Sequence, residues 1–125
     1  MIGLGRRVPV FAFAEIVDMR RSFDTLGAIV REHMKHDILD RALFVFVGRD
    51  RRRAKVLFWE GTGLCVLAKR LEKGRFAAPW ERTKTGVIEW TTSELALFLE
   101  GSGLVGRVPL SPPAWKPGER RVSFL

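Results

Sequence analysis

Five basic side chains lie within seven residues in the middle of the chain, opposed there only by an aspartate at position 50. They are Arg49, Arg51, Arg52, Arg53 and Lys55. An arginine guanidinium is planar and carries several donors, so it can bind a phosphate through two parallel hydrogen bonds. The cluster predicts contact with a nucleic-acid backbone, although solvated turns also tolerate arginines that bind nothing.

A nuclease centre is the first catalytic alternative, because clustered carboxylates could hold two metal ions at a phosphodiester. The candidate carboxylates for such a site are Asp18, Asp24, Asp37, Asp40, Asp50 and Glu60. Asp24 has a structural explanation at a helix start, where a negative charge complements the helix dipole. Asp50 lies inside the arginine-rich run, where it balances charge. We therefore expect no two-metal site.

Other chemistries find little support in the residue pattern. His33 and His36 are three residues apart, but two imidazoles are too few for a closed zinc site. The chain has no Gly-x-x-x-x-Gly-Lys-Ser/Thr run for phosphates and no Gly-x-Ser-x-Gly nucleophile motif. We expect no enzyme activity, no metal and no cofactor.

Composition describes a basic chain with enough apolar material for one core. The 125 residues include 22 Lys and Arg against 14 Asp and Glu, a net charge of +8. This excess favours polyanions, chiefly nucleic acid, with an acidic protein surface as the alternative. The N-terminus lacks a signal-peptide pattern, and no apolar stretch approaches the ~20 residues of a membrane helix. We expect a cytoplasmic protein without membrane contact.

The first half of the chain predicts a strand, a helix and two further strands. Residues 8–14 form a β-prone run in which Pro9 suits a strand start or an edge strand. A helix is expected from about 23 to 35 after Ser22, with a stripe made by Phe23, Leu26, Ile29, Val30 and Met34. The apolar run 43–47 predicts a central strand, and the alternating run 54–60 predicts its neighbour.

The second half predicts a hairpin, a short strand and a second helix. Residues 64–71 fit a strand or a helix; we favour the strand because Glu72-Lys73-Gly74 resembles a hairpin turn. Residues 75–78 would then be the return strand, and 87–90 one more. Thr91 and Glu94 have capping-box spacing before a short helix that Gly101 or Gly103 ends.

These elements predict an α+β fold with a mostly antiparallel sheet of about four to five strands and two helices. We expect residues 1–106 to form a single α+β domain and residues 107–125 to form a basic, proline-rich extended tail. Cys65, the only cysteine, has apolar neighbours that predict a buried thiol. The four tryptophans are candidates for base stacking or, more commonly, for the core: Trp59, Trp80, Trp90 and Trp115.

The expected meander gathers basic residues that are distant in sequence. Alternate turns of an antiparallel sheet lie at the same end, so the loop 49–53 and the turn 72–74 should project together. The candidate nucleic-acid-binding residues are therefore Arg49, Arg51, Arg52, Arg53, Lys55, Lys69, Arg70, Lys73 and Arg75. We predict that the two turns form one basic surface.

Three segments also resemble a known family. They are DMRRSFD at 18–24, LFVF at 43–46 with its arginine-rich loop and KVL at 55–57, and GLC at 63–65 leading to KRLEKGRF at 69–76 and Pro79. In this order they resemble the second-open-reading-frame, TnpB-like accessory protein of the IS66 class of bacterial insertion sequences, over about residues 8–101. One departure is Ala78, where the family pattern has an aromatic residue directly before the proline.

The resemblance implies a role in transposition beside a separate, larger transposase encoded by the element. Two hypotheses follow for this chain. It is a DNA-binding factor that assists the transposase, or it is an adaptor whose basic surface docks an acidic surface of the transposase. The oligomeric state and any base specificity stay open at this point.

Overall fold

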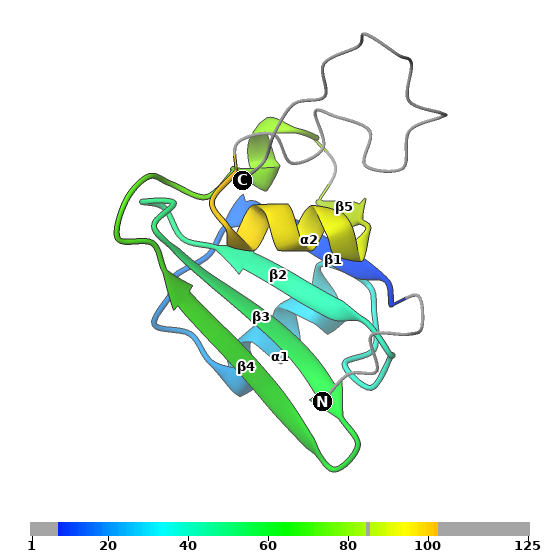
Figure 1. Ribbon diagram of the computed structural model, residues 1–125. Helices are drawn as coiled ribbons and strands as arrows, with labels where there is room; N and C mark the ends of the chain where they lie inside the picture. Colours follow the sequence, from blue (N-terminus) through cyan, green and yellow to red (C-terminus); the bar gives the residue numbers. More distant parts are fainter. Residues whose placement is uncertain (1–7, 85, 103–125) are drawn as a thin grey trace, which may run out of the picture.

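The structure, a computed structural model, describes residues 8–84 and 86–102. Eight elements follow one another along the chain (Figure 1). They are β1 (Val10–Ile16), α1 (Phe23–Glu32), β2 (Leu43–Val47), β3 (Arg53–Glu60), β4 (Gly63–Arg70), a 3₁₀ turn η1 (Pro79–Glu81), β5 (Val87–Trp90) and α2 (Thr92–Leu99). The tail expected at 107–125 lies outside the described residues.

The five strands form one mixed sheet in the order β4-β3-β2-β1-β5. β1 and β2 are parallel because α1 carries the chain back across the sheet, whereas the other three pairs are antiparallel. The α+β fold with a mostly antiparallel sheet is thus confirmed, and so is the central place of residues 43–47. β1 begins directly after Pro9 and lies inside the sheet, so the proline marks a strand start and no edge.

Helices cover both faces of the sheet: α1 lies behind it and α2 in front of it in the view of Figure 1. Strand alternation divides the core accordingly. Towards α1 the sheet presents Phe13, Phe44, Phe46 and Leu57, and towards α2 it presents residues such as Val10, Val45 and Val56. Each face therefore has its own apolar cluster, and the sheet between them is buried on both sides.

The α1 stripe is only partly buried. Leu26 and Val30 have no exposed surface, and Met34 is buried beyond the helix end. Phe23, which we expected in the core, is 45% exposed because it stands in the first turn, beside the exposed loop that precedes the helix. The helix also ends earlier than predicted, at Glu32, and Lys35 already has a left-handed backbone with φ of 59°.

The segment after β4 corrects the prediction of a return strand at 75–78. The strand predicted at residues 64–71 is observed with nearly the same bounds, as β4. Gly74 has the positive φ of 75° that its turn requires. The chain then crosses onto the α2 face instead of pairing with β4. Phe76 is fully buried there, with its ring 4.7 Å from that of Phe98. Burial against a helix, rather than sheet pairing, explains the apolar run.

β4 is consequently an edge strand, and its side chains are more exposed than those of β3. This position corrects a second expectation, since Cys65 is only half-buried and its thiol faces Glu60 at 3.9 Å.

Both ends of α2 form as their residues predict. Thr91 accepts a hydrogen bond from the backbone N–H of Glu94, and the Glu94 carboxylate accepts one from the backbone N–H of Thr91, each at 3.1 Å. At the other end, Gly101 has φ of 83° and its N–H bonds to the carbonyl of Phe98, while the N–H of Ser102 bonds to that of Leu97. This pair of bonds is a Schellman motif, which requires a residue such as glycine in the left-handed region.

Candidate nucleic-acid interface

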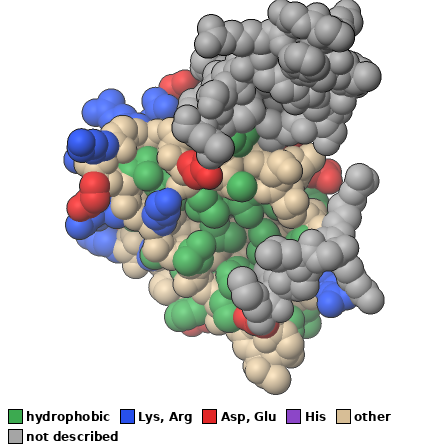
Figure 2. Space-filling view, viewed as in Figure 1, with side chains coloured by type: hydrophobic (Ala, Val, Ile, Leu, Met, Phe, Trp, Pro, Cys, Tyr) green, Lys and Arg blue, Asp and Glu red, His purple; other side chains and the backbone are tan. Residues whose placement is uncertain are grey.

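The β2–β3 turn and the segment after β4 lie at the same end of the sheet. β4 returns antiparallel to β3, so Arg70 pairs with Arg53. The pairing continues past the strands: the N–H of Leu71 bonds to the carbonyl of Arg52 at 2.8 Å, and that of Phe76 bonds to the carbonyl of Arg51 at 2.6 Å. The meander therefore gathers the two predicted basic turns, and Figure 2 shows Lys and Arg side chains crowded at this end, on the left.

Seven of the nine candidate cations are exposed, and the side chains of five of these form no hydrogen bond or ion pair within residues 8–84 and 86–102. These five, which we call the basic edge, are Arg49, Arg52, Arg53, Lys73 and Arg75. Each keeps its full set of donors for an external anion. Three come from the β2–β3 turn and the start of β3, and two come from the turn after β4.

The other four candidates already have partners inside the protein. Arg51 donates from Nε to the carbonyl of Phe76 at 2.8 Å, and its Nη1 lies 3.7 Å from a carboxylate oxygen of Glu81. Arg70 forms an exposed ion pair of 3.3 Å with Glu72. The ammonium groups of Lys55 and Lys69 donate to the backbone carbonyls of Arg21 and Leu99, each at 2.6 Å.

Two of these contacts explain local structure. Leu99 is the last residue of α2, so Lys69 places a positive charge at the negative end of the helix dipole. Arg51 has φ of 60°, a conformation that non-glycine residues rarely adopt. Its backbone carbonyl and its side chain both bind Phe76, and these bonds hold the turn in that conformation.

The loop between β1 and α1 contributes cations that sequence reasoning missed. Arg20 donates hydrogen bonds from Nε and Nη2 to the carboxylate of Asp18 at 2.7–3.1 Å, and its backbone N–H donates to the same carboxylate at 2.9 Å. These bonds hold the pKa of Asp18 well below its ordinary range, and the nearby charge of Arg21 lowers it further. The same ion pair raises the pKa of Arg20.

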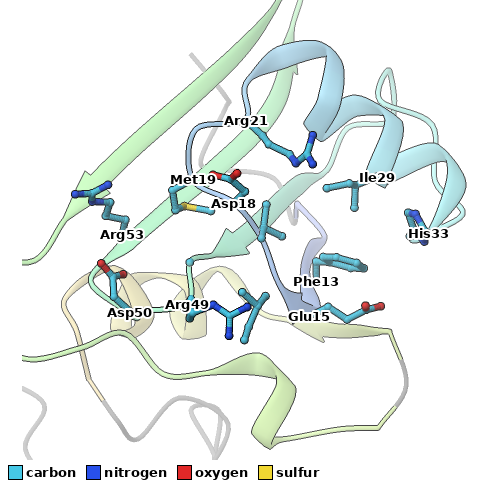
Figure 3. Close-up of a pocket in the computed structure, with 13 residues that line it drawn as sticks. Phe13, Glu15, Asp18, Met19, Arg21, Ile29, His33, Arg49, Asp50 and Arg53 are labelled. Atoms are coloured by element: carbon cyan, nitrogen blue, oxygen red, sulfur yellow. The ribbon is translucent and has the colours of Figure 1, made fainter.

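An open cavity of about 710 Å³ lies beside the basic edge, at the carboxyl ends of the parallel strands β1 and β2. Figure 3 shows Arg49 and Arg53 at one end of it and Phe13, Ile29 and His33 at the other. The β1–α1 loop forms one wall, with Met19 resting on Gly48. A Cβ atom at position 48 would lie 2.6 Å from Cγ of Met19, so the glycine permits this close approach.

The remaining chemical candidates are dispersed or packed. Trp90 is buried and packs against Phe98 at 5.1 Å, Trp59 and Trp80 are half-buried, and Trp115 lies outside the described residues. The ring of His36 packs against that of Phe11 at a tilt of 30°, with the ring centroids 4.1 Å apart. Among residues 8–84 and 86–102, no three His, Cys, Asp or Glu side chains are grouped closely enough to hold a metal ion. No helix within those residues has the length and apolar character needed to cross a membrane.

Comparison with known proteins identifies the family. The model of the IS66 Orf2-like proteins matches residues 8–106, which is most of the chain. The chain belongs to the IS66 Orf2-like family. The chain is also similar to two uncharacterized proteins of Sinorhizobium fredii. Protein y4hO is 36% identical over 117 residues, covering 94% of this chain and 96% of y4hO. Protein y4jC is 30% identical over 101 residues, covering 81% and 85%.

No solved structure matches the chain at a significant level. Membership of the IS66 Orf2-like family indicates an accessory protein of an insertion sequence, and thereby an association with the transposase of that element.

Proposed function

We propose that this IS66 Orf2-like protein is a DNA-binding factor that assists the transposase of its element, and that the basic edge contacts the phosphates of the duplex. The observation that carries the proposal is the gathering of five unengaged cations from two turns at one end of the sheet. Cations in such a patch release counterions from the phosphate backbone, which supplies sequence-tolerant affinity.

The composition of the edge favours phosphate over a discrete acidic peptide. Three of its five members are arginines on one short stretch of chain, and their exposed forks suit phosphate oxygens. Asp50, the acidic residue within that stretch, is exposed but accepts a hydrogen bond from the backbone N–H of Arg52 at 2.9 Å. The Asp50 carboxylate thus has a backbone partner within the turn, and the arginine side chains beside it are exposed to solvent.

The test is the salt dependence of binding to random duplex DNA. Contact with about four phosphates gives a slope of log affinity against log salt near −3.6, at about −0.9 per phosphate. Replacing Arg49, Arg52 and Arg53 by Ala should flatten the slope by about 2.7 if all three bind phosphate. Arg51 is left in place because its guanidinium holds Phe76 and Glu81.

A matched control removes the same charge from the opposite end of the sheet. Arg31→Ala, Lys35→Asn and Arg41→Ala alter three exposed cations near the end of α1 and the start of β2. Asn is chosen at position 35 because it tolerates the left-handed backbone found there. This triple variant should keep the parent slope. If the edge variant also keeps it, the edge is not the phosphate surface, and docking on an acidic surface of the transposase becomes the better hypothesis.

A further inference from the structure

The cavity beside the basic edge has the size and position of a ligand site. Its volume of about 710 Å³ falls within the ~300–1,000 Å³ typical of small-molecule pockets. Parallel strands with a helical crossover place ligands outside their carboxyl ends, and this cavity lies outside the carboxyl ends of β1 and β2. A cavity of this volume and position has room for an occupant larger than a single ion.

The lining calls for a ligand with an anionic end and an apolar body. Arg49 and Arg53 stand at one end, and both lack a side-chain partner within the described residues. Ile29 and the largely buried Phe13 line the other end, where His33 is exposed, and Met19 adds apolar surface nearer Arg53 (Figure 3). A phosphate joined to a flat heterocyclic base fits this division.

The carboxylates of the lining agree with a base as the apolar body. Glu15, Asp18 and Asp50 stand around the cavity, and carboxylate oxygens accept hydrogen bonds from the exocyclic amino groups of bases. Asp50 keeps acceptor capacity beyond its contact with the backbone N–H of Arg52, since an ionised carboxylate offers about four lone-pair sites.

We propose that this cavity receives one unpaired nucleotide of a DNA strand whose neighbouring phosphates lie along the basic edge. Arg49 and Arg53 belong to both the cavity and the edge, so a strand that enters the cavity continues over Arg52, Lys73 and Arg75. A base stacked in a duplex cannot enter, because it must first leave the stack. This inference rests on the DNA-binding function proposed above and specifies a strand end or a distorted duplex as the substrate.

The test compares a blunt duplex with the same duplex carrying a single-stranded extension, by fluorescence anisotropy at fixed salt. The extended probe should bind about tenfold more tightly, the gain that one accommodated base contributes. Ile16→Glu places a negative charge in the cavity at a side chain that is already 43% exposed. This variant should lose the preference for the extension and bind the blunt duplex as its control does.

Leu39→Glu is that control: it makes the same change in charge at a side chain that is 55% exposed and lies outside the cavity. It should keep the tenfold preference. Thermal melting followed by circular dichroism verifies that both variants fold. A parent protein that binds both probes equally overturns the cavity assignment but leaves DNA binding intact, whereas failure to bind either probe refutes the proposed function itself.

Free nucleotides share the chemistry of the proposed ligand, so competition separates the two sources. Deoxynucleoside monophosphates should compete only at concentrations far above the Kd of the extended probe, because they lack the phosphates that reach the basic edge. Equal affinity for a monophosphate and the extended probe would identify a metabolite site and overturn the DNA-strand assignment. A preference for the extension that persists in Ile16→Glu would place the unpaired nucleotide outside the cavity.

Discussion

The guanidinium of Arg51 donates a hydrogen bond from Nε to the backbone carbonyl of Phe76, 2.8 Å away. Phe76 is fully buried and stacks on Phe98 of α2, so this bond links the β2–β3 turn to the α2 layer. Its neighbour Arg52 is exposed, and its side chain has no partner within residues 8–84 and 86–102. These two adjacent arginines therefore differ in role. Arg51 holds the turn against the α2 layer, whereas the side chain of Arg52 is available to bind an external anion.

Arg51→Ala should lower the free energy of unfolding by about 1–3 kcal/mol, because it leaves the Phe76 carbonyl without its partner. Arg52→Ala is the matched control and should change stability by less than about 0.5 kcal/mol. Urea denaturation midpoints measure both. Equal midpoints for the two variants would show that the Phe76 contact contributes nothing.

Leu26→Ala should cost about 2–5 kcal/mol, since the side chain is fully buried between α1 and the sheet. Phe23→Ala removes a larger side chain from the same helix stripe, but one that is 45% exposed. Its effect on the denaturation midpoint should be the smaller of the two. The reverse order would mean that the first turn of α1 packs more tightly than the structure has it.

Gly101→Ala should destabilise the fold by about 1–2 kcal/mol, the cost of a left-handed backbone for a residue with a Cβ atom. The added methyl group would also lie 3.1 Å from Cδ1 of Leu71. Gly63→Ala provides the comparison, because it meets nothing within 4 Å and needs no positive φ. Thermal melting of the pair should separate them, and a Gly101→Ala protein as stable as Gly63→Ala would argue against the Schellman end of α2.

Asp18 should stay ionised below the pH at which an unpaired aspartate protonates. Its pKa is lowered by the hydrogen bonds from Arg20, so the pair stabilises the folded state above the ordinary aspartate value of 3.8 and loses that effect as the pH falls through the lowered pKa. Carboxyl carbon shifts in an NMR titration measure this directly. Arg20→Ala should raise the pKa of Asp18 towards its ordinary value, and an unchanged titration in that variant would exclude Arg20 as the cause.

Periodicity predicted elements whose burial is regular. The continuous apolar run Leu43–Val47 lies in the middle of the sheet, and both caps of α2 follow from short-range residue preferences. The prediction of a strand at residues 75–78 is wrong because burial under a helix and burial in a sheet leave the same apolar pattern in a short segment. Phe23 is the second example. Its helical spacing places it on the apolar stripe, but spacing does not reveal that the first turn of the helix extends beyond the core.

The candidate site was predictable as a gathering of turns but not residue by residue. The antiparallel pairing of β3 and β4 brings the two turns together, whereas the partners of Arg51, Lys55 and Lys69 come from segments 25 to 34 residues away. Arg21, which lines the cavity beside the basic edge, could not be found in this way because its loop joins the site through the parallel pairing of β1 and β2. A helix between two adjacent strands is the available signal, since it puts the loops that follow both strands at one end of the sheet.

Arg53 and Arg70 stand directly opposite each other on neighbouring strands, and like charges in such a cross-strand pair repel. The Glu72 carboxylate pairs with Arg70, which reduces this repulsion but leaves Arg53 without a side-chain partner among the described residues. A polyanion that neutralises Arg53 removes the remaining repulsion, and it binds the folded chain in preference to the unfolded one because the two arginines are brought together only on folding. On the proposed DNA-binding function, duplex DNA should therefore raise the thermal stability of the chain, so that the protein resists unfolding most while it is bound.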